Sequence, residues 1–235
     1  EKRRTDKLTL EEFERIVQYF SNDYRMQAFL TLAFESLGRP QELLYLKIRD
    51  VEMYDNYARI WISEHGKEGT GFLRCIDSFP YVSKWYNSHP LRLTSEAFLF
   101  INLGSTNKHE QMRPRNVNKK IREACISLNI TKPITCYSLK RNGVTYRRLR
   151  GDSDVEIQHA ARWTSTKQLK TYDLSNQDDT FKLELIRRGL IPPDEKYKYI
   201  IPDKKCGFCA HLNGIADATC RNCLRPLNRQ EILKK

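Results

Sequence analysis

Apolar residues recur at helical spacing along much of the chain, and this pattern predicts a mainly helical body. Thr9 and Glu12 have the spacing of an N-terminal capping box, and apolar positions three and four apart follow. The segment 23–37 reads as a largely buried helix, which Gly38 ends. Further helical patterns cover residues 113–128, 137–151, about 153–161, about 166–173 and 178–190.

Between the first helices and the later ones, the pattern changes to alternation. Residues 58–64 alternate apolar and polar positions, 65–71 are rich in glycine, and 71–77 read as a returning strand. This predicts a β-hairpin with Lys67 at its tip. The expected fold class is therefore mainly α with a small antiparallel β-sheet (α+β).

Length and composition are those of a globular protein. A chain of 235 residues with 40% hydrophobic content can bury a core and fits one domain with an appendage. The chain shows no apolar run near 18 residues and no signal-like start, so we expect a soluble, cytoplasmic protein without a membrane partner. Because it opens without methionine inside a charged segment, we also expect a further N-terminal domain upstream.

The positive charge is concentrated in the second half of the body. The formal net charge is +12, and residues 111–175 contain 14 Lys and Arg against 5 Asp and Glu. A surface that only keeps the protein soluble could carry such charge, but the contrast with the near-neutral N-terminal half favours a nucleic-acid partner.

Four of the seven cysteines form two closely spaced pairs, Cys206 with Cys209 and Cys220 with Cys223. The pattern C-x2-C-x10-C-x2-C supplies four thiolates for a structural Zn²⁺, which a segment of about 30 residues with few apolar positions needs in order to fold. An iron site and uncoordinated thiols are the alternatives. Three further cysteines stand in apolar contexts and are expected in the core: Cys75, Cys125 and Cys136.

These patterns predict three parts in the chain. Residues 1–190 form the helical body, the proline-containing segment 191–203 is a linker, and 204–235 form a zinc ribbon.

Candidate chemistry is concentrated at a few positions of the body. Arg39 directly precedes Pro40 at a predicted helix N-terminus, where backbone N–H groups favour an anion. Tyr137, Lys140 and Arg141 share one face of a predicted helix through their i, i+3 and i+4 spacing.

Several of these segments, taken in order, resemble one known family. "ESLGRPQELLYL", "HGKEGTGFLR" and "YSLKRNGVTYRRLRGDSDVEIQHAARWTSTKQLKTY" are similar to the signature boxes and hairpin of the tyrosine recombinases, the phage-type integrases. The family has G-x-R-x-x-E-L, then a lysine hairpin, then H-x-x-R, a glycine, G-[HW] and a tyrosine nine residues later, which is the spacing from Trp163 to Tyr172. The resemblance covers roughly residues 8–175, and a trailing zinc ribbon is similar to archaeal members.

The resemblance implies a reaction and a role for each matching residue. Tyr172 would attack a DNA phosphodiester and form a 3′-phosphotyrosyl link, without any cofactor for catalysis. Arg39 would hold the non-bridging oxygens with its planar guanidinium, Lys67 would protonate the leaving oxygen, and Trp163 would donate its indole N–H to the phosphate. The partner would be double-stranded DNA, bound by a homo-oligomer that forms a tetrameric synapse.

The sequence departs from the family pattern at two positions. Tyr137 stands in the histidine slot and Lys140 in the arginine slot, and Arg141 follows directly. We expect both Lys140 and Arg141 to reach the site.

The leading hypothesis is a site-specific DNA recombinase that integrates or excises a mobile element. A catalytically inactive DNA-binding relative of the same fold and a strand-nicking DNA topoisomerase remain alternatives.

Overall fold

The computed structural model describes residues 5–62, 71–105 and 107–192, and parts of the segment beyond 203. Contacts divide the chain into two compact units, Glu1–Lys198 and Tyr199–Lys235. The division falls inside the predicted linker, most of which lies outside the described residues. The two units are described separately below.

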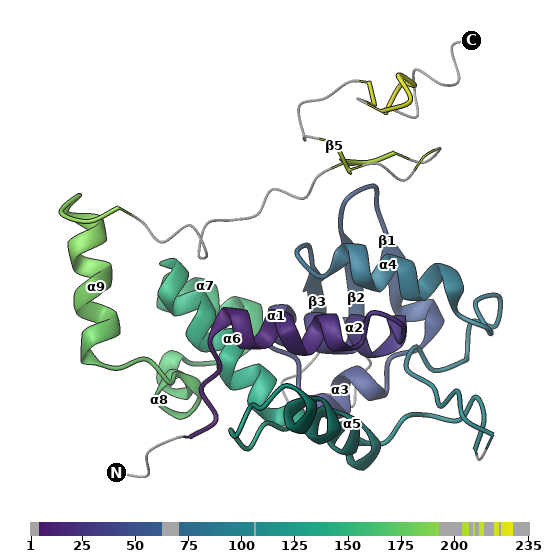
Figure 1. Ribbon diagram of the computed structural model, residues 1–235, viewed down its shortest axis with the longest axis horizontal. Helices are drawn as coiled ribbons and strands as arrows, with labels where there is room; N and C mark the ends of the chain where they lie inside the picture. Colours follow the sequence, from purple (N-terminus) through teal and green to yellow (C-terminus); the bar gives the residue numbers. More distant parts are fainter. Residues whose placement is uncertain are drawn as a thin grey trace. The chain divides into compact units, whose positions relative to one another are not determined.

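The first unit is mainly helical and contains one small sheet (Figure 1). Strands β1 (Val51–Met53), β2 (Ala58–Ile62) and β3 (Gly71–Cys75) form an antiparallel sheet in the order β1-β2-β3. The register pairs Ala58 with Cys75 and Ile62 with Gly71, and β2 alternates buried and exposed side chains. The predicted fold class and the hairpin strands are therefore confirmed, whereas the hairpin's connection, with Lys67, lies outside the described residues.

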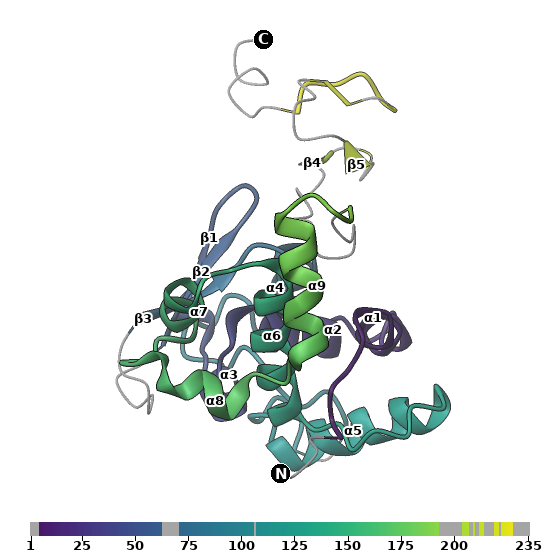
Figure 2. The same cartoon turned by 90° about the vertical axis from the view of Figure 1, so that its left-hand side faces the viewer.

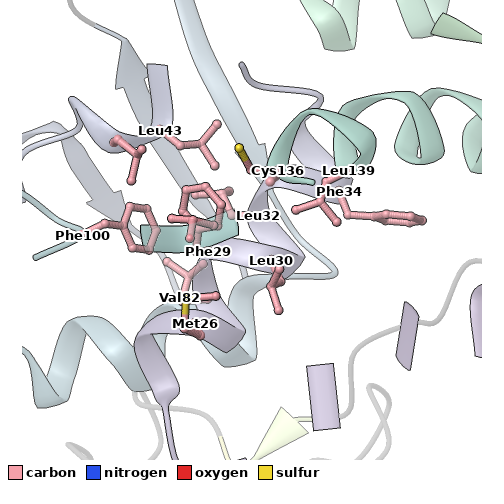
Figure 3. Packing of buried hydrophobic residues seen from close by; sticks show 14 of the residues in the cluster. Met26, Phe29, Leu30, Leu32, Phe34, Leu43, Val82, Phe100, Cys136 and Leu139 are labelled. Atoms are coloured by element: carbon pink, nitrogen blue, oxygen red, sulfur yellow. The ribbon is translucent and has the colours of Figure 1, made fainter. Parts of the chain in front are cut away.

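Helix α2 (Tyr24–Ser36) is the centre of the body, since it contacts α1, α3, α4, α6 and β3. The neighbouring α1 (Leu10–Tyr19) begins with the predicted capping box, in which Glu12 N donates to Thr9 Oγ1 over 3.1 Å. Figure 3 shows the core around α2, where Phe29 lies edge-on to Phe100 with ring centroids 5.3 Å apart. Burial of such large side chains, each worth about 1.5–3 kcal/mol, stabilises this centre.

The end of α2 differs from the prediction. The helix ends at Ser36, and Leu37 rather than Gly38 takes the left-handed conformation, with φ of 57°. Gly38 is needed for space instead, because a Cβ there would lie 2.4 Å from Leu43 Cδ1. The Leu37 side chain is buried in a small second core, described below, and this packing offsets the cost of its backbone.

The middle of the body contains elements that the pattern did not predict. Helix α4 (Phe79–Ser88) packs against α2, and the short turn η1 (Ile48–Asp50) leads into β1. The short helix α3 (Pro40–Leu44) has proline at its first position, as expected.

The later helices follow the predicted segments. They are α5 (Pro114–Ser127), α6 (Cys136–Arg150), α7 (Asp154–Ala161), the turn η2 (Thr166–Gln168), α8 (Leu169–Tyr172) and α9 (Gln177–Arg187). Figure 2 faces the side that carries α7, α8 and α9, and α6 contacts each of these three helices. Gly151 ends α6 with φ of 99°, a conformation that glycine adopts without steric cost.

In the second unit, the described residues include two short antiparallel strands, β4 (Lys204–Lys205) and β5 (Leu212–Asn213).

The three cysteines predicted in the core of the body, Cys75, Cys125 and Cys136, are all buried. None of the helices in the described ranges has the length and hydropathy needed to cross a bilayer.

Candidate active site

Tyr172 lies in an aromatic and cationic stack at the end of α8. Its ring stacks on that of Trp163, with centroids 5.2 Å apart and an interplanar angle of 28°. Lys140 Nζ lies 5.0 Å from the Tyr172 centroid and 5.5 Å from the Trp163 centroid. Lys140 is only 1% exposed, so little water separates its side chain from the two rings.

A small second core supports this stack. Tyr172 packs against a buried cluster that consists of Leu37, Val144, Ile157, Ala160, Ala161, Trp163 and Leu169. The cluster joins the end of α2 to α6, α7 and α8. The segments that precede Arg39 and that carry Tyr172 are therefore packed on the same apolar base.

A pocket of about 300 Å³ opens beside the tyrosine. It is lined by Asp6, Tyr137, Arg141, Thr171 and Tyr172. Tyr137 is 45% exposed, so its hydroxyl-bearing ring is accessible at the position that the family pattern gives to histidine. The helical spacing that placed Tyr137 and Arg141 on one face of α6 thus brings both to Tyr172.

Arg141 is held in this pocket by a carboxylate from the N-terminal segment. Its Nε donates to Asp6 Oδ2 over 2.8 Å, and its Nη2 also bonds to that oxygen. The Nη2 group lies 3.4 Å from Ser138 Oγ as well. No motif in the sequence pointed to Asp6 as a site residue, because it stands in the charged segment before the first helix.

Arg39 stands at the N-terminus of α3, as predicted. Its backbone N–H donates to Glu42 Oε2 over 2.8 Å, which gives the short helix a side-chain cap. The side chain of Arg39 is half-buried. The structure thereby assigns the glutamate of the G-x-R-x-x-E-L pattern a role in fixing the arginine's backbone.

Arg162 is a site residue that the motif analysis missed. Its Nη2 donates to Glu42 Oε2 over 2.6 Å, and the two side chains are 8% and 5% exposed. Glu42 therefore connects Arg39 to Arg162, and Trp163 follows Arg162 directly in the chain. A signal was present in the sequence, because Arg162 occupies the position where the family pattern has glycine before His or Trp.

Several polar atoms in this region are buried and lack a hydrogen-bond partner among the described residues. They are Glu42 Oε1, Arg162 Nε and Nη1, and Trp163 Nε1. Buried polar atoms nearly always have partners in folded proteins, so such a group of unused atoms is typical of a site that binds a ligand. Three of the four are donors, the two guanidinium nitrogens and the indole nitrogen, and these fit an oxyanion, whereas Glu42 Oε1 is an acceptor.

Contacts therefore link most of the predicted site residues. Arg39, Glu42 and Arg162 form one connected set, and Trp163, Lys140 and Tyr172 form the next, with Arg141 and Tyr137 in the adjoining pocket. Positive side chains outnumber carboxylates, since only Glu42 and Asp6 oppose them in these contacts. Such an arrangement can bind a phosphodiester beside a phenol oxygen.

The second unit brings the four predicted cysteines together. The sulfur atoms of Cys206, Cys209, Cys220 and Cys223 all lie within 4.8 Å of one another. Cys206 Sγ lies 3.6 Å from Cys223 Sγ, and Cys209 Sγ lies 3.5 Å from Cys220 Sγ. A tetrahedral ion bound at about 2.3 Å places its sulfur ligands roughly 3.8 Å apart, so the cluster can hold a metal ion.

Comparison with known proteins supports the same family. The model of the phage integrase family matches residues 6–178. The fold is similar to that of the XerA recombinase, with a TM-score of 0.63 and 19% identity over 77% of this chain and 63% of that one.

Two further structures are similar. One is the XerH site-specific recombinase in a post-cleavage complex with palindromic difH substrate, with a TM-score of 0.63 and 15% identity over 78% of this chain and 53% of that one. The other is lambda integrase(75-356) bound as a dimer to a COC′ core site, with a TM-score of 0.54 and 17% identity over 73% of this chain and 60% of that one. This chain spans between about half and two thirds of the length of these proteins. No curated protein matches it. The family match and the fold together show that the chain belongs to the phage integrase family, the tyrosine recombinases that its motifs resemble.

Proposed function

We propose that this chain is the catalytic domain of a site-specific recombinase, which cleaves and rejoins duplex DNA through Tyr172. The observation that supports this most is the position of Tyr172, stacked on Trp163 and 5.0 Å from the Lys140 ammonium, at the edge of a pocket that Arg141 also lines. The XerH structure is a post-cleavage DNA complex, and a lambda integrase structure is a tetramer on a Holliday junction. We infer duplex DNA and a homo-oligomer for this chain too, acting in the cytoplasm on the ends of a mobile element.

The proposed step is an exchange of phosphoester bonds. The Tyr172 oxygen bonds to phosphorus as the bond from phosphorus to the 5′-oxygen breaks, which leaves a 3′-phosphotyrosyl link and a 5′-hydroxyl. Tyr172 loses one proton and the leaving oxygen gains one. One phosphoester bond replaces another, so the step needs no nucleotide as an energy source. Attack by a 5′-hydroxyl reverses the step and rejoins the strand.

The roles proposed for the other residues follow from their chemistry. Arg39 neutralises the non-bridging oxygens through a planar fork, and Trp163 adds its indole N–H. Lys140 and Arg141 supply further positive charge, with Arg141 the more damaging to lose because its two parallel donors, which bond to Asp6 in this structure, match a phosphate. Lys67, in the β2–β3 connection, is proposed as the general acid for the leaving oxygen.

A covalent trap tests the proposal. The protein is incubated with a pool of duplexes of random sequence, each with a nick in one strand. Cleavage close to the nick releases a short fragment that carries the 5′-hydroxyl, and because this fragment diffuses away, the strand cannot be rejoined. A denaturant-stable protein–DNA adduct is expected from wild type, and its sequence defines the preferred duplex. Tyr172→Phe should abolish the adduct while DNA binding is kept, because only the phenol oxygen is removed.

The controls separate the alternatives. Tyr137→Phe, which removes the other phenol of the pocket, should still give an adduct. Adduct formation by Tyr172→Phe would assign the nucleophile to another tyrosine. No adduct from wild type would favour the inactive DNA-binding relative, which the lysine in the arginine slot supports. Relaxation of supercoiled DNA without recombinant products would favour the topoisomerase.

Salt dependence tests the DNA partner independently of cleavage. If Lys and Arg contacts to phosphates dominate, the affinity for duplex DNA should fall by roughly tenfold or more between about 50 and 200 mM salt. An affinity that does not change with salt would contradict DNA as the partner.

A further inference from the structure

Arg162 has a backbone conformation that its side chain does not favour. It follows α7 with φ of 57° and ψ of 32°, in the left-handed region. Glycine, which the family pattern has at this position, adopts this conformation without the steric cost that an arginine incurs. An unfavourable backbone at a buried site is retained when the side chain contributes something, and this makes the contacts of Arg162 informative.

The Arg162 side chain contacts Glu42, in the first signature segment, and lies close to Gly71, at the start of β3. Its Nη2 donates to Glu42 Oε2 over 2.6 Å, and that same oxygen accepts the Arg39 backbone N–H over 2.8 Å. At the start of β3, a Cβ on Gly71 would lie 3.1 Å from Arg162 Cδ. Arg162 therefore lies between the N-terminus of α3 and the end of the β2–β3 connection, the two places where the family's phosphate-binding arginine and lysine are expected.

Most of the guanidinium's donors have no acceptor in the part of the chain that the structure describes. Although the side chain is only 8% exposed, Nε and Nη1 have no hydrogen-bond partner among the described residues. Trp163 Nε1, on the next residue, is in the same state. Glu42 accepts from one nitrogen only, so it orients the guanidinium and leaves the Nε and Nη1 donors for another acceptor.

The arginine slot of the family pattern is occupied by Lys140, which contacts the rings of Trp163 and Tyr172. A lysine offers a point charge where a phosphoryl transition state is best matched by a planar pair of donors. We propose that Arg162 supplies this missing second guanidinium and that one of its two unused N–H groups, at Nε or Nη1, donates to a non-bridging oxygen of the scissile phosphate, beside Arg39. This inference rests on the proposed function.

The test compares a charged and a neutral scissile group. The duplex selected by the covalent trap is made with either a phosphodiester or an uncharged methylphosphonate at the scissile position, and the rate of adduct formation is measured at saturating DNA. The variant is the double substitution Arg162→Gly with Glu42→Gln. Glycine at position 162 adopts the left-handed conformation without steric cost. Glutamine at position 42 avoids a buried carboxylate that has lost its arginine partner, so we expect the double variant to fold. Glu42→Gln alone is the matched control.

On the phosphodiester, the double variant should form adduct at least about 10²-fold more slowly than Glu42→Gln alone, the usual loss when one oxyanion donor is removed. The methylphosphonate lacks the negative charge that the guanidinium neutralises. On this substrate the rates of the double variant and of Glu42→Gln alone should therefore differ by less than about tenfold. An equal deficit on both substrates would show that Arg162 only positions Arg39 and would overturn the proposal.

A second measurement does not depend on cleavage and separates this inference from the proposed function. Inorganic phosphate is added during thermal unfolding of both proteins. It should raise the melting temperature of the Glu42→Gln protein more than that of the double variant, because only the former has the Arg162 donors. Non-specific salt effects are the same for both. Equal stabilisation would refute a phosphate contact of Arg162, whereas a missing adduct from wild type refutes only the recombinase activity.

Discussion

Asp6 and Arg141 are separated by 135 positions in the sequence and form an ion pair inside the pocket that Tyr172 lines. The pair is part of a wider attachment of the N-terminal segment to the body. Asn142 Nδ2 donates to the Asp6 carbonyl over 2.8 Å, and Leu8 N donates to Asn142 Oδ1 over 2.7 Å. Arg141 can therefore bind a phosphate only in exchange for, or together with, a carboxylate.

Asp6→Asn should strengthen DNA binding. The amide still accepts a hydrogen bond but carries no charge, so a phosphate displaces it more easily, and we expect the dissociation constant to fall by about threefold to tenfold. Fluorescence anisotropy with a labelled duplex measures this. Asp179→Asn, which removes the neighbouring Lys7 ion pair, is the control and should have a smaller effect. Weaker binding by Asp6→Asn would show that Asp6 holds Arg141 ready for DNA instead.

Lys140→Met should slow adduct formation. Methionine fills a similar volume, and thermal unfolding of the variant is measured first, because removing one partner of a buried charged contact is destabilising. The positive charge 5.0 Å from the Tyr172 centroid is lost, so we expect a rate lower by at least about 10²-fold at saturating DNA.

An exposed lysine that also contacts a tyrosine ring provides the control for loss of such a contact. Lys84 Nζ lies 3.8 Å from the Tyr24 ring centroid, on the remote helix α4. Lys84→Met should leave the rate unchanged. If Lys140→Met cleaves DNA at the wild-type rate, Lys140 serves only to pack the two rings.

Asp152→Asn should destabilise the body strongly at neutral pH. Asp152 accepts from Arg147 Nη1 over 3.0 Å and from Arg150 Nη2 over 2.8 Å, and all three side chains are less than 10% exposed. Burial raises the pKa of Asp152, but the hydrogen bonds and charges of Arg150 and Arg147 outweigh it and lower the pKa below its ordinary value of 3.8. Breaking such a buried pair costs about 3–5 kcal/mol of unfolding free energy.

The pH dependence follows from the direction of that shift. The ionised carboxylate stabilises the folded state fully above its ordinary pKa, and this contribution is lost as the pH falls through the lowered value. Urea denaturation between about pH 7 and pH 3 should therefore show a difference between wild type and Asp152→Asn that narrows in acid. Asp154→Asn is the exposed control and should cost less than about 1 kcal/mol. A difference that does not change with pH would contradict the ionic origin.

Substituting one cysteine of the four-cysteine cluster tests whether the second unit binds a metal ion. We propose a structural Zn²⁺ there, so Cys206→Ser or Cys223→Ser should lose one zinc per chain and unfold the residues beyond about 203. Elemental analysis and NMR spectra measure the two effects. Cys125→Ala, a buried cysteine of the body, should retain the metal. Pure wild-type protein without zinc would contradict the proposed metal.

The helices and the hairpin strands could be predicted because their signals are local. Thr9 and Glu12 form the predicted capping box, and β2 has the predicted alternation. Helix α4 was missed because Pro80 and several aromatic residues weaken its helical pattern, and β1 is only three residues long.

The candidate site was less predictable, because its contacts join distant segments. Motif spacing brought Trp163, Tyr172 and Lys140 together correctly. It could not reveal that Asp6 pairs with Arg141 or that Glu42 pairs with Arg162 across 120 positions, since no periodicity encodes either contact. The end of α2 was mispredicted for a related reason, because tertiary packing of Leu37 overrides the preference for glycine.

Gly143 sets how closely two functional segments approach. A Cβ at this position of α6 would lie 2.0 Å from the Phe34 carbonyl oxygen, so α2 and α6 meet backbone to backbone. Even Gly143→Ala would therefore push apart the helix that leads to Arg39 and the helix that carries Lys140. Two helices in such contact behave as one stiff frame, with slow amide hydrogen exchange. If the proposed function is correct, we expect any rearrangement on DNA in segments with fewer contacts to that frame, such as α9.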